Sequence, residues 1–247
     1  MNEIKLLDHG HIRLCESMGS DLSIVRSARV SYDAAWRAGE DAGSDRRLIR
    51  YLWKNGHTSP FECVAFTFEV KAPIFVLRQW MRHRTQSYSE LSARYKELPE
   101  EYYLPALEII GKQSTNNKQV REITEIDTDT LSMRQLQLTI VDDHHKNSFK
   151  IYHALLAEGW PRELARSVLP VATYSHMFTT VNLLNLLRFL TLRCDDHAQT
   201  EIRIYAEAML ELVRPVVPEA VTAWEQTTAS RRLKLQPTLG LQHHSRK

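Results

Sequence analysis

The densest group of side chains that could do chemistry lies between residues 78 and 95, where the sequence reads RQWMRHRTQSYSELSARY. Arginine forks bind phosphate through paired hydrogen bonds, and serine hydroxyls with backbone N–H groups complete such a site. The segment therefore predicts a phosphate site. Two other interpretations stay open: a solvated charged face, or an RNA-binding surface of arginine interleaved with aromatic residues, although no matching basic stripe occurs elsewhere.

A second polar concentration follows the most apolar stretch of the chain, at residues 192–199 (LRCDDHAQ). A buried, unpaired arginine is costly, so Arg193 is expected to face a site or a buried carboxylate. Cys194 beside it could be a nucleophile, because a neighbouring cation lowers the pKa of a thiol. A small core cysteine is the favoured interpretation.

No metal site is expected anywhere in this sequence, and its two runs of acidic residues and histidine do not suggest one. Asp195, Asp196 and His197 are consecutive. Consecutive helical residues point about 100° apart, so these three cannot face one ion. The run at residues 142–145 (DDHH) fails for the same reason.

Two further positions could belong to a site. His57 lies just before a possible helix start at Ser59 and Pro60, where a histidine is more often a hydrogen-bonded loop residue than a catalyst. Arg162 and Arg166 are four residues apart, which places them on one side of a helix. They could be surface charge or phosphate ligands.

Hydrophobic spacing predicts the elements that must position these side chains. Residues 64–71 (VAFTFEVK) alternate apolar and polar, which is typical of a half-buried strand. Helices are predicted at 45–55, between an N-cap at Ser44 and Gly56, and from Pro73 onward, with another start at Ser59. Residues 83–95 are predicted to be a polar loop that enters another helix.

The second half of the chain is predicted to be mostly helical. The segment 181–192 is apolar almost all round and should form a central helix. Residues 113–130 are polar without a period and are expected to be an exposed, poorly ordered insertion. The fold class is therefore α+β, a small mostly antiparallel sheet packed with a helical body. The other helices are expected at about 136–159, 161–170 and 202–215.

Composition bounds the class of protein. The chain has 247 residues, which suit one domain at 1–225 followed by a basic, flexible tail at 226–247. A net charge of +2 favours neither a nucleic-acid partner nor a membrane surface, and no apolar run is long enough for a membrane span. Three widely spaced cysteines without C-x-x-C indicate a reducing, cytoplasmic compartment.

Several common catalytic and nucleotide-binding motifs are missing from the sequence. It contains no G-x-G-x-x-G, G-x-x-x-x-G-K-[ST], G-x-S-x-G or H-E-x-x-H. A nucleotide cofactor would therefore not be held by a Rossmann unit.

Residues 82–95 carry a resemblance to a known family. They read R-H-R-x-x-S-x-S-E-x-S-x-R-Y and closely resemble the signature of flavin-dependent thymidylate synthases, R-H-R-x-x-S-x-N-E-x-S-x-R. The resemblance runs through nearly the whole chain, to about Ala223. Its other segments are ARVSY at 28–32, GHxxPFE at 56–62, KAPIFVxRQW at 71–80, PRExARxxLP at 161–170 and LRxDxHAQ at 192–199.

The resemblance implies an activity and its partners. It implies C5 methylation of dUMP to dTMP, with methylenetetrahydrofolate as carbon donor and FAD reduced by NADPH, without a cysteine nucleophile. It also implies a homotetramer with active sites shared between subunits. A dianionic nucleotide and a pyrophosphate would explain why so many arginines gather in a near-neutral protein.

The same resemblance assigns roles residue by residue. The two catalytic positions are Arg193, which would contact the pyrimidine ring, and His57, which would lie near the flavin ring and the folate. Arg94 and Arg166 would meet the nucleotide phosphate. The remaining nucleotide positions are Gln79, Glu90, Ser92 and the backbone of Ala93. The flavin positions are Ser31, Ser59, Glu62, Arg82, His83, Arg84, Asn182, Arg188 and His197.

The chain departs from the family pattern at three positions. Ser89 replaces the signature Asn, Leu184 stands where many members have an arginine, and Arg188 stands where an Asn or His is common. The last two would exchange one flavin-phosphate contact for another, one turn later. Because position 89 lacks the amide, a related reaction on another deoxypyrimidine monophosphate, such as dCMP hydroxymethylation, stays open. A non-catalytic flavin- or RNA-binding relative is the remaining alternative.

Overall fold

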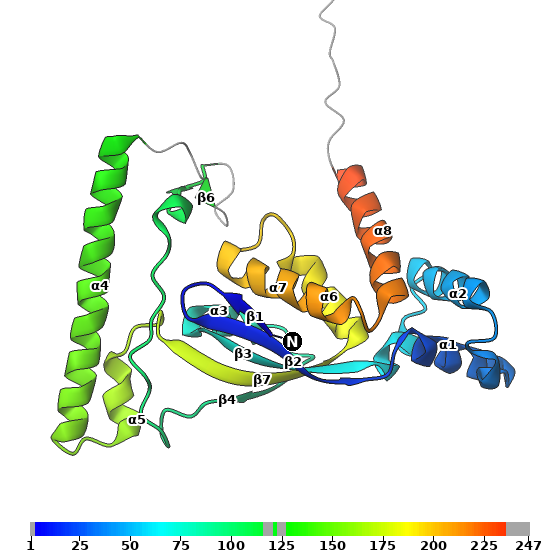
Figure 1. Ribbon diagram of the computed structural model, residues 1–247, viewed down its shortest axis with the longest axis horizontal. Coiled ribbons are helices and arrows are strands. Elements are labelled where there is room, and N and C mark those ends of the chain that lie inside the picture. The colour runs from blue at the N-terminus through cyan, green and yellow to red at the C-terminus, as the bar shows by residue number, and fades with distance from the viewer. Residues whose placement is uncertain (1–2, 116–120, 123–126, 236–247) are drawn as a thin grey trace, which may run out of the picture.

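A five-stranded antiparallel sheet forms the middle of the molecule, with helices over one face and further helices at its two ends (Figure 1). The computed structural model describes residues 3–115, 121–122 and 127–235, with side chains as far as Thr228. The expected α+β class is confirmed.

The elements have the following bounds. The strands are β1 (Glu3–Leu6), β2 (Gly10–Met18), β3 (Ala65–Pro73), β4 (Ser87–Glu90), β5 (Lys112–Gln113), β6 (Arg121–Glu122) and β7 (Tyr174–Asn182). The α-helices are α1 (Asp21–Arg29), α2 (Ala42–Lys54), α3 (Ile74–Trp80), α4 (Thr128–Ala157), α5 (Arg162–Ala165), α6 (Leu183–Arg193), α7 (Thr200–Val213) and α8 (Pro218–Leu235). Short 3-10 segments are η1 (Val30–Tyr32), η2 (Ala35–Arg37), η3 (Ser59–Cys63), η4 (Leu107–Ile109) and η5 (Arg166–Val168).

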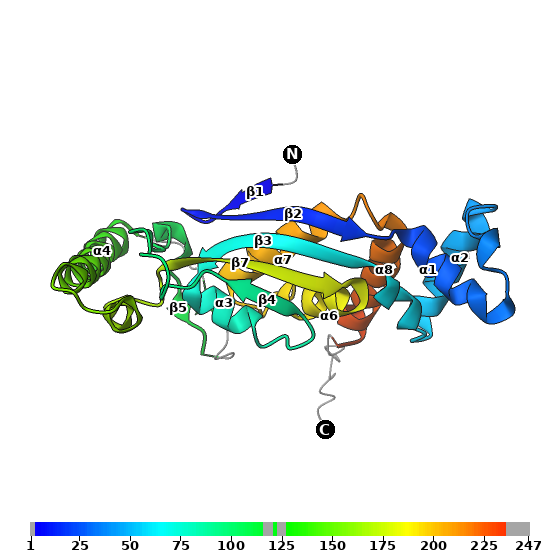
Figure 2. The ribbon, with the colours of Figure 1, turned by 90° about the horizontal axis from the view of Figure 1, so that it is seen from below.

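The main sheet has one apolar and one polar face. Its strand order is β1-β2-β3-β7-β4, with β3 in the centre. Alternate residues of β3 confirm the predicted period of two, since Phe66, Phe68 and Val70 are buried while Glu69 and Lys71 point the other way. Figure 2 views the sheet from its polar face and shows the strands in front of α6, α7 and α8.

Helices α6 and α7 cover the apolar face of the sheet, and α8 packs beside α2 and α6 at one end of it (Figure 1). The predicted central helix is there as α6, with buried leucines along most of its length. Trp80, at the end of α3, is fully buried and packs on Phe189 of α6 with ring centroids 5.0 Å apart. Its indole N–H donates to Gln86 Oε1 at 3.1 Å. Within the described ranges, no helix is both long and apolar enough to cross a membrane.

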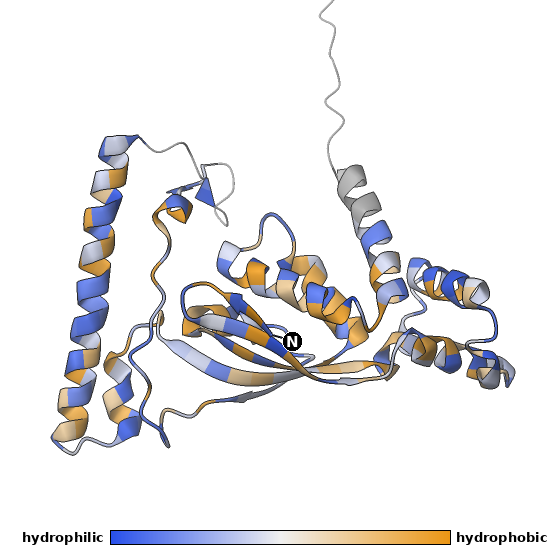
Figure 3. Cartoon of the chain, viewed as in Figure 1, coloured by the Kyte–Doolittle hydropathy of each residue, from blue (hydrophilic) through white to orange (hydrophobic). Residues whose placement is uncertain are grey.

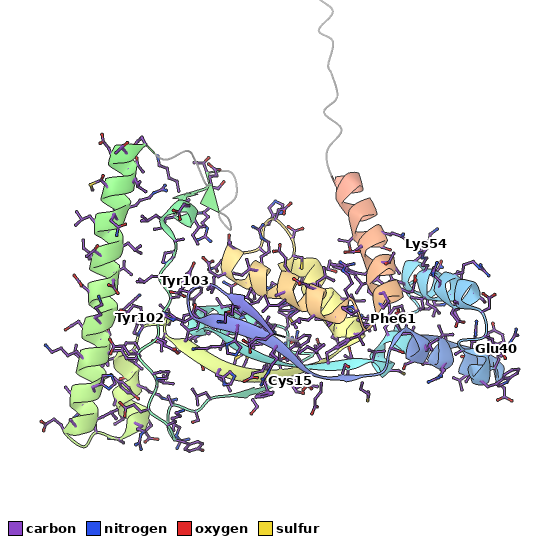
Figure 4. All side chains as sticks on the ribbon, in the orientation of Figure 1. Cys15, Glu40, Lys54, Phe61, Tyr102 and Tyr103 are labelled. Carbon is purple, nitrogen blue, oxygen red and sulfur yellow. The ribbon has the colours of Figure 1, made fainter. Side chains whose placement is uncertain are left out.

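Two adjacent tyrosines (Figure 4) connect the segment that runs beside the long helix α4 to both α4 and α7, and α4 is also held by a hydrogen bond between Tyr152 and the Leu98 N–H. Tyr102 donates a hydrogen bond to Asp142 of α4 at 2.6 Å, and Tyr103 donates to Glu201 of α7 at 3.1 Å. Successive side chains of an extended segment point in opposite directions, so Tyr102 can contact α4 while Tyr103 contacts α7. Polar and apolar residues are mixed along α4 (Figure 3), which has only a small cluster around Phe149 to bury.

The segment predicted as a polar loop contains a strand. β4 pairs with β7 from Ser87 opposite Thr180 to Glu90 opposite Met177, and turns rather than a helix follow it. This edge strand is mostly exposed, so its side chains give no apolar alternation. Its backbone pairing with β7, which the local sequence does not encode, decides its conformation.

The predicted helix at 181–192 is two elements. β7 continues through Val181 to Asn182, whose side chain then caps α6 by accepting a hydrogen bond from the Asn185 N–H at 2.9 Å. The strand escaped prediction because Met177 on the buried face and Phe178 on the exposed face are both apolar. The contrast that marks a half-buried strand is therefore absent.

Two predicted helix starts also differ. α2 begins at Ala42, because the carboxylate of Asp41 accepts the Ser44 N–H at 3.0 Å. Ser44 thus lies in the first turn and is not the N-cap. At Ser59 the chain forms a short 3-10 segment that leads into β3.

The polar insertion and the tail are partly regular. Strand β5, which ends at Gln113, pairs with β6 inside the predicted insertion 113–130, and α4 begins at Thr128, capped by Asp127. Helix α8 continues to Leu235, past residue 225 where the flexible tail was expected to begin. Residues 116–120, 123–126 and 236–247, which belong to these two expectations, lie outside the described residues.

Phe68→Ala is expected to lower the free energy of unfolding by about 3–5 kcal/mol, because Phe68 is fully buried and its removal leaves a cavity. Phe178→Ala is the matched control on the polar face, where the ring is 43% exposed, and should change it by only about 0.5 kcal/mol. Urea unfolding measures both. An equal loss for the control would show that the polar face is covered in solution.

Candidate active site

The arginine that ends α6 lies against the start of the arginine-rich segment. Arg193 Nε donates to His83 Nε2 at 2.9 Å, and its Nη2 lies 3.4 Å from the backbone oxygen of Gln79. The ring of Phe189 meets His83 at a centroid distance of 4.7 Å. The fold thus brings together Gln79, His83 and Arg193, three of the predicted site residues.

Burial and the neighbouring guanidinium determine the charge of His83. Burial first, and then the positive charge of Arg193, lowers the pKa of His83 from 6.5 to about 4. Since Arg193 donates to Nε2, the imidazole is neutral with its proton on Nδ1. Burial also lowers the pKa of Arg193, which stays charged at neutral pH. In this pair the guanidinium of Arg193 is therefore charged, and the neutral imidazole of His83 orients it.

A chain of part-buried polar groups that ends at the buried Glu201 holds Gln79. Its amide donates to Gln199, which donates to Glu201 Oε2 at 2.9 Å. Glu201 is 2% exposed and also accepts from Tyr103 at 3.1 Å and Arg121 at 2.8 Å. Burial raises the pKa of Glu201, but the hydrogen bonds from Arg121 and Gln199 outweigh it and lower the pKa overall. The sequence did not single out Glu201, because an acidic residue in a first helical turn is ordinary.

Two arginines predicted to bind phosphate meet at one glutamate. Arg94 Nε lies 3.3 Å from a carboxylate oxygen of Glu163, and Arg166 Nε is 3.4 Å from the backbone oxygen of the same residue. Ser92 Oγ accepts the Arg94 N–H at 3.3 Å, and Ala93 is buried beside them. The sequence proposed no role for Glu163, although its place between Arg162 and Arg166 is a usable signal.

Glu90 and Ser89 point to opposite faces of the sheet. Glu90 Oε1 accepts from Ser175 Oγ at 2.6 Å on the side covered by helices. Ser89 pairs with Phe178, so its side chain lies on the polar face. The departure from the signature at Ser89 therefore does not change the immediate surroundings of Glu90.

Two predicted flavin residues and the predicted catalytic histidine line one cavity at the α1–α2 end of the molecule. Ser31, His57 and Ser59 share a cavity of about 770 Å³ with Tyr32 and Tyr51. The rings of His57 and Tyr51 meet edge to face at 5.9 Å. Hydroxyls and an imidazole beside aromatic walls suit a flat ligand with a polar edge. The sequence missed both tyrosines, and an aromatic exposed on a polar helix, as Tyr51 is, is the signal that could have found one.

A neighbouring cavity of about 470 Å³ includes the next predicted cofactor residue, Arg188. Leu184, Trp53 and Trp224 line it as well, and Thr58 lines both cavities. Asn182 is used as the cap of α6. The remaining predicted cofactor residues are on the surface, namely Glu62, Arg82, Arg84 and His197.

The predicted residues do not form one site within one chain. β7 begins at Tyr174 opposite Pro73 and ends at Asn182 opposite Ala65, and nine extended residues span roughly 27 Å. α5, which carries Glu163, lies near the first end of β7, whereas α1 and α2 lie at the other (Figures 1 and 2). The arginine pair and the His57 cavity are therefore at opposite ends of the sheet.

Comparison with known proteins decides the family. Residues 13–219 match the family model described as thymidylate synthase complementing protein. The chain is 45% identical over 224 residues to the flavin-dependent thymidylate synthase of Treponema denticola, covering 91% of this chain and 82% of that protein. The chain belongs to the flavin-dependent thymidylate synthase family.

Other relatives agree, and this flavin-dependent thymidylate synthase family member is an enzyme of that kind. The Thermus thermophilus protein is 45% identical over 224 residues, covering 90% of this chain and 78% of that protein. The solved structure of the UMP/dUMP methylase PolB from Streptomyces cacaoi, bound with 5-Br dUMP, is 35% identical with a TM-score of 0.79. It covers 90% of this chain and 97% of that one. The resemblance drawn from residues 82–95 is thereby confirmed.

NMR titration of His83 is expected to give a midpoint near 4, well below the ordinary 6.5. Between about pH 6.5 and 4, His83 binds a proton in the unfolded chain but not in the folded one. The folded state is therefore fully stable with respect to this group above about pH 6.5 and loses stability as the pH drops toward 4. Arg193→Gln should raise the midpoint by removing the cation. A wild-type midpoint near 6.5 would contradict the geometry of this pair.

Proposed function

We propose that this family member methylates dUMP at C5 to give dTMP, with methylenetetrahydrofolate as carbon donor and FAD reduced by NADPH. Membership of the family supports the reaction, and a UMP/dUMP methylase with the same fold supports the substrate. The observation that carries the proposal is that Arg94 pairs with the carboxylate of Glu163, while Arg166, from the same short segment as Glu163, donates to its backbone oxygen. Two guanidiniums from distant segments therefore lie around one residue, and the one on Arg94 can exchange the carboxylate for a phosphate.

Arg94 and Arg166 would bind the phosphate of the nucleotide. The side chains of Arg94 and Glu163 are 56% and 52% exposed, so their ion pair is weak and easily replaced. A dianionic phosphate forms stronger, bidentate hydrogen bonds with the guanidinium. Ser92 and the backbone of Ala93 would supply further donors.

Arg193 and Gln79 would hold the pyrimidine ring. Arg193 keeps its charge in a half-buried position, where a fixed cation stabilises developing negative charge better than water does. His83 accepts from Nε and so orients the guanidinium without cancelling its charge. Glu90, beside Ser175, and the network behind Gln79 would restrict which pyrimidine fits.

The donor set around the His57 cavity fits a flavin. Ser31 and Ser59 offer hydroxyls, and the imidazole of His57 would lie near the ring and the folate. Arg188 in the adjoining cavity would provide a cation for the pyrophosphate, where Leu184 cannot. When bound and reduced, FAD supplies the hydride. Glu62, Arg82, His83, Arg84, Asn182 and His197 would complete its contacts.

The proposed reaction uses no cysteine nucleophile. Cys15 and Cys63 are exposed, and Cys194 packs partly against the core at the end of α6. The lining of the His57 cavity, as far as it is described, includes no cysteine. We therefore assign the activation of the pyrimidine to electrostatics, with Arg193 as the charged group.

The separation of the two groups of residues supports active sites shared between chains, which the family resemblance implies for a homotetramer. Within one chain the arginine pair and the His57 cavity are at opposite ends of a nine-residue strand. A second copy could place its cavity beside the arginines of the first, as a closed symmetric assembly does repeatedly.

Product analysis tests the reaction. The purified protein is incubated with FAD, NADPH and methylenetetrahydrofolate, and dUMP, UMP and dCMP are offered separately. Mass spectrometry is expected to show a methyl gain on dUMP. Arg193→Ala should reduce turnover on the order of 10²–10³-fold by removing the charge at the ring. Hydroxymethylation of dCMP would overturn the proposed substrate and make Ser89→Asn the first reversion to test.

Complementation between variants tests the shared site. Arg166→Ala and His57→Ala should each be nearly inactive alone. Co-expressed, they should regain about a quarter of the wild-type activity, because random assembly then pairs intact halves from different chains. Activity per purified mixed oligomer is the measurement. If mixing restores nothing, both residues serve the same chain's site.

A further inference from the structure

The polar face of the sheet carries two histidines and a glutamate on three adjacent strands. His11 of β2 and His176 of β7 both lie opposite Lys71 of β3. Glu69 is two residues before Lys71 on the same strand, so all four side chains share one face. This face is opposite the one covered by α6 and α7, and lies away from Arg193.

The potential ligand atoms of these residues converge. One nitrogen from each histidine and one carboxylate oxygen of Glu69 all lie within 4.8 Å of one another. His176 Nε2 is 2.7 Å from Glu69 Oε1. That nitrogen is shielded from solvent, yet no group in the described part of the chain forms a hydrogen bond with it. The close approach of His176 Nε2 to Glu69 Oε1 thus places two potential metal ligands side by side, but it is not a hydrogen bond.

The charged neighbours leave the centre of the cluster open. Lys71 would otherwise stand between the histidines, but its ammonium is held by Glu101 at 2.7 Å. The guanidinium of Arg13 contacts Glu69 Oε2, which leaves Oε1 turned toward His176. A group that fixes the second oxygen of a carboxylate in this way orients the first for a ligand.

We propose that His11, Glu69 and His176 form a binding site for a first-row divalent transition metal, with Zn²⁺ as its simplest occupant. Two imidazoles and one carboxylate are a set that zinc accepts, with bonds of about 2.0–2.2 Å. Small side-chain rotations bring atoms that are already within 4.8 Å to that spacing. The three strands hold the ligands on a rigid scaffold, and at least one coordination position stays open to water. This site does not depend on the proposed methylation.

Zinc binding to the full-length protein tests the site. Two tail histidines could bind zinc on their own, so all measurements use a His243→Gln, His244→Gln background. After treatment with EDTA, calorimetry and elemental analysis should find one Zn²⁺ per chain. Co²⁺ in its place should give the visible absorption of a four- or five-coordinate site. Glu69→Gln and His176→Gln should each weaken zinc binding by at least about tenfold.

A second histidine–carboxylate pair on this chain is the matched control. His153 Nδ1 lies 2.8 Å from Glu97, and its side chain is 42% exposed against 39% for His176. His153→Gln should leave zinc binding unchanged. Circular dichroism without zinc should show that every variant is folded, and zinc should raise the melting temperature of the wild type and the His153 variant but not of the ligand variants.

Two results would overturn the proposal. In the first, the EDTA-treated protein binds zinc no more tightly than its Glu69→Gln variant does. In the second, His153→Gln weakens zinc binding as much as His176→Gln does. The first would leave the cluster an ordinary ion pair. The second would show that zinc binds surface histidines without selection.

Discussion

The pairing of β3 with β7 is the constraint on which the rest of the structure depends. Nine residues of each strand are in register, from Ala65 opposite Asn182 to Pro73 opposite Tyr174. Because side chains alternate, a slip of one residue would turn Glu69 into the core and Phe68 out to solvent. The same register aims every polar side chain of the central strands, and it also fixes where α3, α6 and β4 begin.

The buried charge of Glu201 is tolerable because it is paired. Glu201 is almost fully buried, and Arg121, Gln199 and Tyr103 all donate to it. Removing one partner of such a group leaves an uncompensated charge, which is far more costly than never having buried the pair. A network of this kind lends little net stability, but it holds Gln79 in one orientation. The partner of Arg193, in contrast, is a neutral histidine and not an opposite charge. The positive charge of Arg193 therefore stays available to a ligand.

The fold keeps its two candidate half-sites apart. The arginine pair around Glu163 belongs to the α4–α5 end, where the cluster around Phe149 is small, and the His57 cavity belongs to the α1–α2 end. The rigid sheet between them cannot bend to join them. Under the proposed function, association of chains brings the arginine pair of one chain next to the His57 cavity of another, which the folding of a single chain does not do.

Residue identity and period by themselves determined a large part of this protein. The alternation at 64–71 specifies a half-buried strand, and the arginine, serine and glutamate pattern at 82–95 specifies the family, because both depend only on neighbours in sequence. The tertiary structure decided β4 and β7, whose side chains show no contrast between faces and whose conformation comes from pairing with distant strands. It also decided the roles of Glu163 and Glu201, and the meeting of His11, Glu69 and His176. Strand register and helix packing bring such groups together. The free energy of these long-range contacts depends on residues far apart in the sequence, so no local pattern can predict it.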